Sequence, residues 1–113
     1  MKVIITKRFE KEYLKKLSKY LTKINLVETL KNKEHKFISL HEPFLKFKNK
    51  INLVEFRGVL AVKDNSNIIP LFIFLKKDKK FGENVSWETQ EKMIELEFEL
   101  NVLDLENGNY EIF

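Results

Sequence analysis

The chain has 113 residues, of which 43% are hydrophobic and 34% charged, so it can form one domain, residues 1–113, with a modest core. It contains no cysteine, which excludes a disulfide framework and a thiolate metal site, and its two histidines, His35 and His41, predict no zinc site. The net charge is +4, no run approaches the roughly 18 apolar residues of a membrane span, and the N-terminal apolar run is too short for a signal peptide, so we expect a cytoplasmic protein.

The first third of the chain predicts a strand followed by helices. Residues 3–5 are a short β-branched run, and Thr6 stands where a helix N-cap belongs. Helical spacing then predicts an amphipathic helix over residues 7–20, and a second short helix over residues 26–30; the apolar positions are Phe9, Tyr13, Leu17, Leu21, Ile24, Leu26, Val27 and Leu30. We expect a helical hairpin or elbow on one face of a sheet, with one bent helix as the alternative, since neither proline nor glycine separates the two.

The middle of the chain predicts an antiparallel β-meander of three to four strands. Residues 36–40, 44–50, 52–62 and 68–75 read as strands, broken at Pro43 and by a turn at residues 64–67. On the second of them, Phe44, Lys46, Lys48 and Lys50 share one side. The last run is apolar on both faces, as in a central strand covered on both sides, although Pro70 would remove one ladder hydrogen bond.

The end of the chain predicts a loop at residues 81–84 and then a helix. Ser86 is the expected N-cap, the helix is expected to continue to Leu105, and Asn107–Gly108 is a good stop signal. Residues 94–105 also alternate in the manner of a strand, in which case Asn107–Gly108 would be a hairpin turn. The fold class that we expect is α+β, with an N-terminal strand, a helical hairpin, the meander and a C-terminal helix.

The charges are unevenly distributed along the chain. Residues 1–87 carry 20 Lys/Arg against 9 Asp/Glu, a net of +11, whereas residues 88–113 carry 1 against 8, a net of −7. A basic body is typical of nucleic-acid binding, but a lysine-rich composition from an AT-rich genome explains it as well. The acidic segment 88–106 is either a solvated helix face or a segment that lies in the basic groove and blocks it.

The stretch from Leu53 to Lys80 points most directly to a function. Arg57 lies in an apolar run, where an arginine is costly without a partner or a task, and four lysines follow the next strand. Together they predict a sheet end that presents cations to an anionic ligand, with nucleic acid as the first candidate.

The chain resembles the RelE/ParE superfamily of bacterial toxins, in its HigB-like branch. The residues that carry the resemblance are Phe9 and Tyr13 after the first strand, Phe56–Arg57 within a strand, and the apolar strand 69–75 followed by Lys76–Lys77. The resemblance spans most of the chain in element order, although its motifs are short. It implies a toxin that a cognate antitoxin protein silences. The toxin would be an mRNA endoribonuclease, free or on the ribosome, that needs no metal or nucleotide cofactor and attacks the phosphate with the ribose 2′-hydroxyl to leave a cyclic phosphate.

The resemblance also implies the site residues. Arg57 and Lys77 would clamp the phosphate, and Lys48 or Lys50 would act as base or electrostatic partner; Lys46, Lys76, Lys79, Lys80 and Phe81 would contact RNA. The alternatives are an Arg57–Glu55 ion pair, solvated lysines, and packing of Phe81 and Trp87 under the last helix instead of stacking on bases.

The chain departs from the family pattern in having no tyrosine or histidine near the C-terminal end of the sheet. Tyr110 and His41 are the only remote candidates for a general acid. Two other functions therefore stay open, a non-catalytic toxin of the ParE kind that acts on DNA gyrase, and a basic RNA-binding module without activity.

Overall fold

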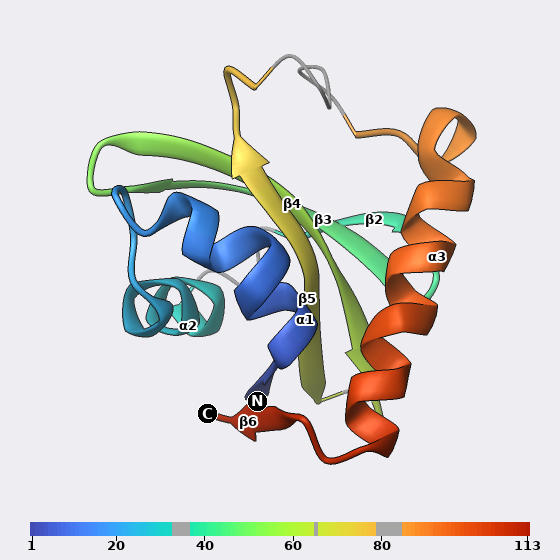
Figure 1. Cartoon of the computed structure of the whole chain (residues 1–113). Helices are drawn as coiled ribbons and strands as arrows, with labels where there is room; N and C mark the ends of the chain where they lie inside the picture. The colour runs from blue at the N-terminus through green and yellow to red at the C-terminus, as the bar shows by residue number, and fades with distance from the viewer. Residues whose placement is uncertain (33–36, 65, 79–84) are drawn as a thin grey trace.

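The computed structural model describes residues 1–32, 37–64, 66–78 and 85–113. They form an α+β fold with a mixed six-stranded sheet in the order β2-β3-β4-β5-β1-β6 (Figure 1). The predicted fold class is confirmed at this level. Within the described segments no helix has both the length and the apolar character needed to cross a membrane.

Four consecutive strands form the predicted antiparallel meander. These are β2 (Ile38–His41), β3 (Phe44–Ile51), β4 (Val54–Lys63) and β5 (Asn67–Leu75), each paired with the next. The prediction that residues 52–62 form one strand is wrong at its start, because Asn52 and Leu53 have positive φ angles and turn the chain. Pro70 is accommodated in β5 next to a register shift between Val59 and Leu60, where the ladder is irregular.

The sheet is completed by two strands at its other side. The N-terminal strand β1 (Lys2–Thr6) pairs in parallel with β5, and β6 (Tyr110–Ile112) pairs antiparallel with β1. Strand β6 was not predicted. It has three exposed residues, so it buries no alternating apolar face that a sequence pattern could reveal.

The N-terminal helical segments differ in detail from the prediction. Thr6 is the N-cap as expected, since its Oγ1 accepts a hydrogen bond from the Phe9 backbone N–H at 3.1 Å. The helical stretch then passes through α1 (Lys7–Phe9), a π-helical turn η1 (Glu10–Leu14) and a 3-10 turn η2 (Lys15–Leu17), so it ends three residues before Tyr20. A separate helix, α2 (Lys23–Asn32), follows, and the alternative of one bent helix is wrong.

The C-terminal segment is a helix, α3 (Trp87–Glu106), so the strand alternative for residues 94–105 is wrong. Gly108, with φ of 72°, follows the end of the helix in the left-handed region that glycine favours. Ser86 has the extended backbone of an N-cap, but its Oγ contacts Thr89 Oγ1 at 2.6 Å instead of capping a backbone N–H.

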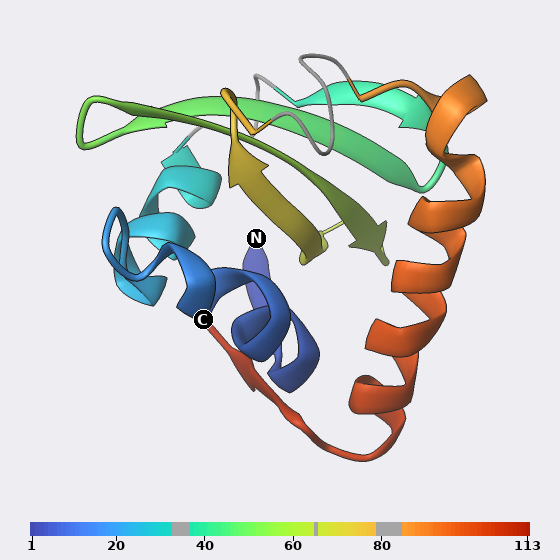
Figure 2. The ribbon, with the colours of Figure 1, turned by 45° about the horizontal axis from the view of Figure 1, so that its top comes forward.

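The sheet is covered on both faces, which agrees with the prediction that residues 68–75 form a central strand covered on both sides. One apolar cluster joins Phe47, Phe56 and Leu60 to the α2 residues Leu26 and Leu30. The other joins Phe44, Val59, Ile69, Phe72 and Phe74 to Ile94 of α3. In Figures 1 and 2, α2 and α3 lie far apart with strands between them, and the tip of the β3–β4 hairpin lies at the end of the molecule away from α3.

Candidate functional site

The β3–β4 hairpin and the end of β5 place the cationic side chains. Lys48 is directly opposite Arg57, and Arg57 is directly opposite Phe74. Arg57 is two residues before Val59, which belongs to the cluster under α3, so Arg57 and Lys48 lie on that same face of the sheet. The same alternation along β3 places Phe44, Lys46 and Lys50 on this face with Lys48, as predicted.

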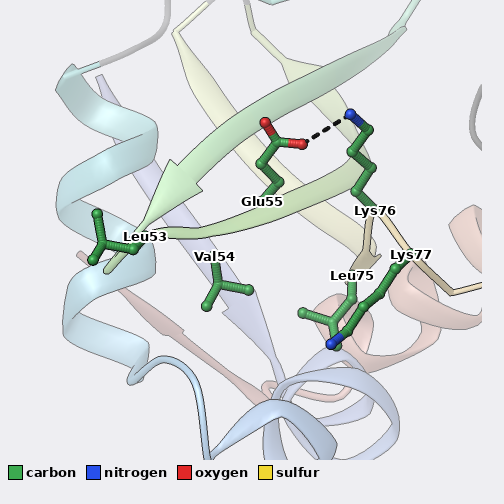
Figure 3. Close-up of a pocket in the computed structure, with 6 residues that line it drawn as sticks. All are labelled: Leu53, Val54, Glu55, Leu75, Lys76 and Lys77. Atoms are coloured by element: carbon green, nitrogen blue, oxygen red, sulfur yellow. Dashed lines mark ion pairs between the residues drawn. The ribbon is translucent and has the colours of Figure 1, made fainter.

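A second row of charges lies next to the first. Lys50 is opposite Glu55, and the Lys76 backbone N–H donates to the Glu55 carbonyl at 3.0 Å. The Lys76 Nζ lies 3.1 Å from Glu55 Oε2 (Figure 3). This hydrogen bond from Lys76 lowers the pKa of the Glu55 carboxyl below its ordinary value, with smaller contributions from the charges of Lys50 and Arg57. The direct salt-bridge partner of Glu55 is therefore Lys76, whereas the alternative from the sequence paired it with Arg57.

The two rows surround one pocket of about 270 Å³ at the surface of the sheet. Its lining consists of Lys48, Asn49, Lys50, Glu55, Phe56, Arg57 and Lys76. Four cations and one carboxylate give this lining a net charge of +3. Lys48 and Arg57 are like charges directly opposite each other on neighbouring strands, and a bound anion would lower the repulsion between them. The arrangement therefore suits a bound anion, and the planar guanidinium of Arg57 suits the oxygens of a phosphate.

Lys77 is not brought to this pocket. Successive residues of an extended chain point to opposite faces, and Phe74 shares the face of Arg57, so Lys76 shares it too and Lys77 does not. Lys77 lines a different pocket with Leu53, Val54, Glu55, Leu75 and Lys76, and Figure 3 shows it directed away from the Glu55–Lys76 ion pair. The cation after β5 that lines the pocket with Arg57 is therefore Lys76, whereas the sequence analysis expected Lys77.

Lys46 lies on the same face as Arg57 but reaches another element. Its Nζ donates to the Val85 carbonyl oxygen at 3.5 Å, just before α3 begins. The predicted RNA contacts Lys79, Lys80 and Phe81 lie outside the described residues, as does the loop predicted at residues 81–84.

The two remote candidates for a general acid lie elsewhere. His41 stacks on Trp87 with ring centroids 4.4 Å apart, and Trp87 also stacks on Phe44. Trp87 thus packs against other rings of the chain at the beginning of α3, which favours the packing alternative over stacking on RNA bases. Tyr110 lies on β6, where it pairs with Thr6 of β1. Two strands, β1 and β5, separate β6 from β4, the strand of Arg57.

A polar network that the sequence did not predict joins α1 and η1 to α3. Glu97 accepts hydrogen bonds from Arg8 Nε at 2.9 Å and Nη2 at 2.8 Å, and from Tyr13 Oη at 2.7 Å. Asp104 accepts from the Arg8 backbone N–H at 2.7 Å. Burial, together with the hydrogen bond to Glu97, raises the pKa of the Tyr13 phenol above its ordinary value. The only sequence signal for this network was a glutamate on the side of α3 that also carries Ile94.

The acidic helix does not lie in the cationic pocket. Its Ile94 and Glu97 are buried against the body, and the residues that line the pocket come from β3, β4 and the end of β5. The hypothesis that the segment 88–106 blocks the groove is therefore wrong for the described residues, and the segment is part of the packed fold.

Within the described ranges, no three or more carboxylate or histidine side chains are grouped so that they could hold a metal ion. Comparison with known proteins gave no match to a family model, a curated protein or a solved structure.

Proposed function

We propose that this chain is a toxin of the RelE/ParE superfamily, in its HigB-like branch, that cuts mRNA, free or on the ribosome, in the cytoplasm without a metal or nucleotide cofactor. The observation that carries the proposal is the pocket formed by Lys48, Lys50, Arg57 and Lys76, where four cations from three strand segments meet a single carboxylate. The resemblance of the sequence to that superfamily, and an element order compatible with it, support the same conclusion.

In the proposed reaction, the phosphate of the RNA backbone sits between Arg57 and Lys48. The ribose 2′-hydroxyl gives its proton to a base and its oxygen bonds to phosphorus; the bond from phosphorus to the 5′-oxygen breaks, and that oxygen takes up a proton. The products are a 2′,3′-cyclic phosphate and a 5′-hydroxyl. Arg57 and Lys76 would stabilise the charge that develops on the phosphorane, and Lys48 or Lys50 would act as base or electrostatic partner.

A cognate antitoxin is part of this proposal. A protein that covers the cationic pocket must neutralise a net charge of +3 on its lining, so its contacting segment is expected to be acidic. Growth of the host would depend on this partner, as for other toxins of the superfamily.

A second candidate is an RNA-binding module without activity. It is favoured by one observation, that the described lining of the pocket contains neither histidine nor tyrosine to protonate the leaving oxygen. The two candidates predict the same RNA contacts and differ only in whether the chain cuts.

The test is induced expression in a bacterial host of the wild type, Arg57→Ala and Lys63→Ala, with growth curves and primer-extension mapping of transcripts. Lys63 is an exposed cation at the other end of the same strand, so its loss controls for charge. The proposal predicts growth arrest with discrete new 5′ ends for the wild type and Lys63→Ala, and neither for Arg57→Ala. Arrest without new ends would instead favour inhibition of DNA gyrase. Healthy growth with soluble wild-type protein that still binds RNA would favour the binding module.

A further inference from the structure

The outer side of α3 carries a stripe of leucines. Leu96, Leu100 and Leu103 follow one another at intervals of four and three residues, so they share one side of the helix, as the a and d positions of a coiled coil do. Leu96 is 55% exposed, Leu103 is 52% exposed, and Leu100 is half-buried. A single exposed leucine is ordinary, but three along one side of a helix form a continuous apolar surface, which is typical of an interface.

The side of α3 that faces the body of the protein holds polar side chains as well as apolar ones. Its buried residues are Ile94, Glu97 and Asn101. Glu97 accepts hydrogen bonds from Arg8 at 2.9 and 2.8 Å, and the Asn101 side chain donates to the Glu97 carbonyl oxygen at 2.7 Å. A helix that buries a glutamate and an asparagine while its leucines face solvent gains less from apolar burial than the opposite arrangement would give. The leucine stripe therefore contributes little to the packing of this chain.

A pocket of about 530 Å³ between η1 and α3 lies beside the stripe. Met93, which is one turn before the first leucine of the stripe, lines this pocket together with Glu12, Lys16 and Glu97. Lys16 Nζ lies 3.9 Å from Glu12 Oε2. Two carboxylates and one ammonium give the described lining a net charge of −1, so the pocket favours a cationic side chain.

Acidic side chains flank the other side of the stripe. Glu99 and Glu106 each lie three residues after a leucine of the stripe, so they are its neighbours on the helix surface. Residues 87–106 carry seven Asp/Glu and one lysine, a net of −6. An apolar stripe with acidic borders is complementary to a helix whose own apolar stripe is bordered by lysine or arginine. A second copy of α3 would instead bring carboxylates against carboxylates, which disfavours self-association through this side.

We propose that the Leu96–Leu100–Leu103 stripe is the docking surface for a basic amphipathic helix of a partner protein. The apolar residues of that helix pack on the three leucines, and its lysine or arginine side chains lie against Glu99, Glu106 and the pocket between η1 and α3. The described lining of the Arg57 pocket contains none of these residues, so the inference does not depend on the proposed function.

The test uses the full chain and two synthetic helical peptides of about three heptads each. Both peptides carry lysine at the positions that border the seam; one has leucine at the a and d positions, and the other has glutamine there. Fluorescence anisotropy of the labelled peptides gives the affinity, and amide chemical shifts of the isotope-labelled protein give the location of binding.

The informative variant is the double substitution Leu96→Gln and Leu103→Gln, which removes apolar surface but keeps the charge of α3. Ile24→Gln, which changes a residue of α2 that is 53% exposed, is the matched control. Because these three side chains are largely exposed, both proteins are expected to melt close to the wild type.

We expect the leucine peptide to bind the wild type and Ile24→Gln equally, and to bind the double variant about tenfold more weakly or worse. Its binding should shift the amides of residues 93–106, and the glutamine peptide should bind as weakly as the leucine peptide binds the double variant. Neutralising Glu99 and Glu106 with glutamine should weaken binding and lower its salt dependence.

Three results would overturn the proposal. The first is a folded double variant that binds the leucine peptide with wild-type affinity, or amide shifts that lie away from α3. The second is a wild type that does not bind the leucine peptide. The third is a wild type that self-associates in analytical ultracentrifugation while the double variant is monomeric, which would assign the stripe to a second copy of this chain.

Discussion

Replacing Glu97 by glutamine tests the polar network that joins α3 to the N-terminal helical segments. The Glu97 carboxylate, whose side chain is only 8% exposed, accepts two hydrogen bonds from Arg8 and one from Tyr13. Glutamine is isosteric but neutral, so the Arg8 guanidinium would lose its salt bridge while still partly buried.

The size of the effect follows from burial. Breaking a fully buried ion pair costs about 3–5 kcal/mol, but Arg8 keeps a side chain that is 29% exposed and so retains part of its hydration. We therefore expect the free energy of unfolding to fall by about 2–3 kcal/mol. An unfolding entropy of about 2.1 cal/mol/K per residue gives about 0.24 kcal/mol/K for 113 residues, so the melting temperature should fall by about 8–13 °C.

The assay is thermal unfolding followed by circular dichroism at pH 7, with Glu99→Gln as the control. Glu99 is exposed on the same helix, and its neutralisation should move the melting temperature by about 2 °C at most. The reasoning would be refuted by a Glu97→Gln protein that melts within that margin of the wild type, because the network would then carry no net stability.

Three further predictions concern packing, pH and the phosphate pocket. Gly58→Ala should lower the free energy of unfolding by about 3 kcal/mol or more in urea titration, because the new Cβ would lie 2.4 Å from the Phe72 carbonyl oxygen and 2.5 Å from a Phe47 ring carbon. Stability should fall as the pH rises above about 10, since the unfolded state ionises its tyrosine while the raised pKa keeps Tyr13 protonated in the fold; Tyr13→Phe should lose this part of the pH dependence in urea titrations between pH 9 and 11. Arg57→Ala should lower the slope of log affinity for RNA against log salt by about one in anisotropy measurements, and Lys63→Ala should leave the slope unchanged.

Each of these has an outcome that would contradict it. An alanine at position 58 with wild-type stability would mean that the space between Gly58, Phe47 of β3 and Phe72 of β5 is larger than the structure shows. A Tyr13→Phe protein that loses stability with pH as steeply as the wild type would assign the pH dependence to other groups. An unchanged salt slope in Arg57→Ala would remove this residue from the phosphate contacts.

Local sequence patterns were enough to predict most of the sheet. The four meander strands are apolar runs bounded by proline, asparagine and aspartate, and these signals act within a few residues. The grouping of Lys48 with Arg57 was expected only from the family resemblance, because the strand pattern does not fix the register that places them opposite each other.

What the sequence did not predict depends on contacts between distant segments or on single backbone angles. Strand β6 pairs with residues 104 to 108 positions earlier in the chain, and the Arg8–Glu97 salt bridge joins residues 89 positions apart; neither leaves a local pattern. The turn at Asn52–Leu53 was missed because leucine has no preference for turns, and the positive φ of Leu53 is one that leucine rarely adopts. The choice of Lys77 over Lys76 followed the family resemblance, whereas simple alternation from Phe74 would have favoured Lys76.

The central claim is that the Arg57 pocket cuts RNA without a metal. The most direct measurement is incubation of the purified full chain with an mRNA, with and without ribosomes, in excess EDTA, followed by analysis of the new RNA ends. The account predicts 2′,3′-cyclic phosphate and 5′-hydroxyl ends from the wild type and none from Arg57→Ala. Intact RNA with the wild type under both conditions, or equal cleavage by Arg57→Ala, would contradict it.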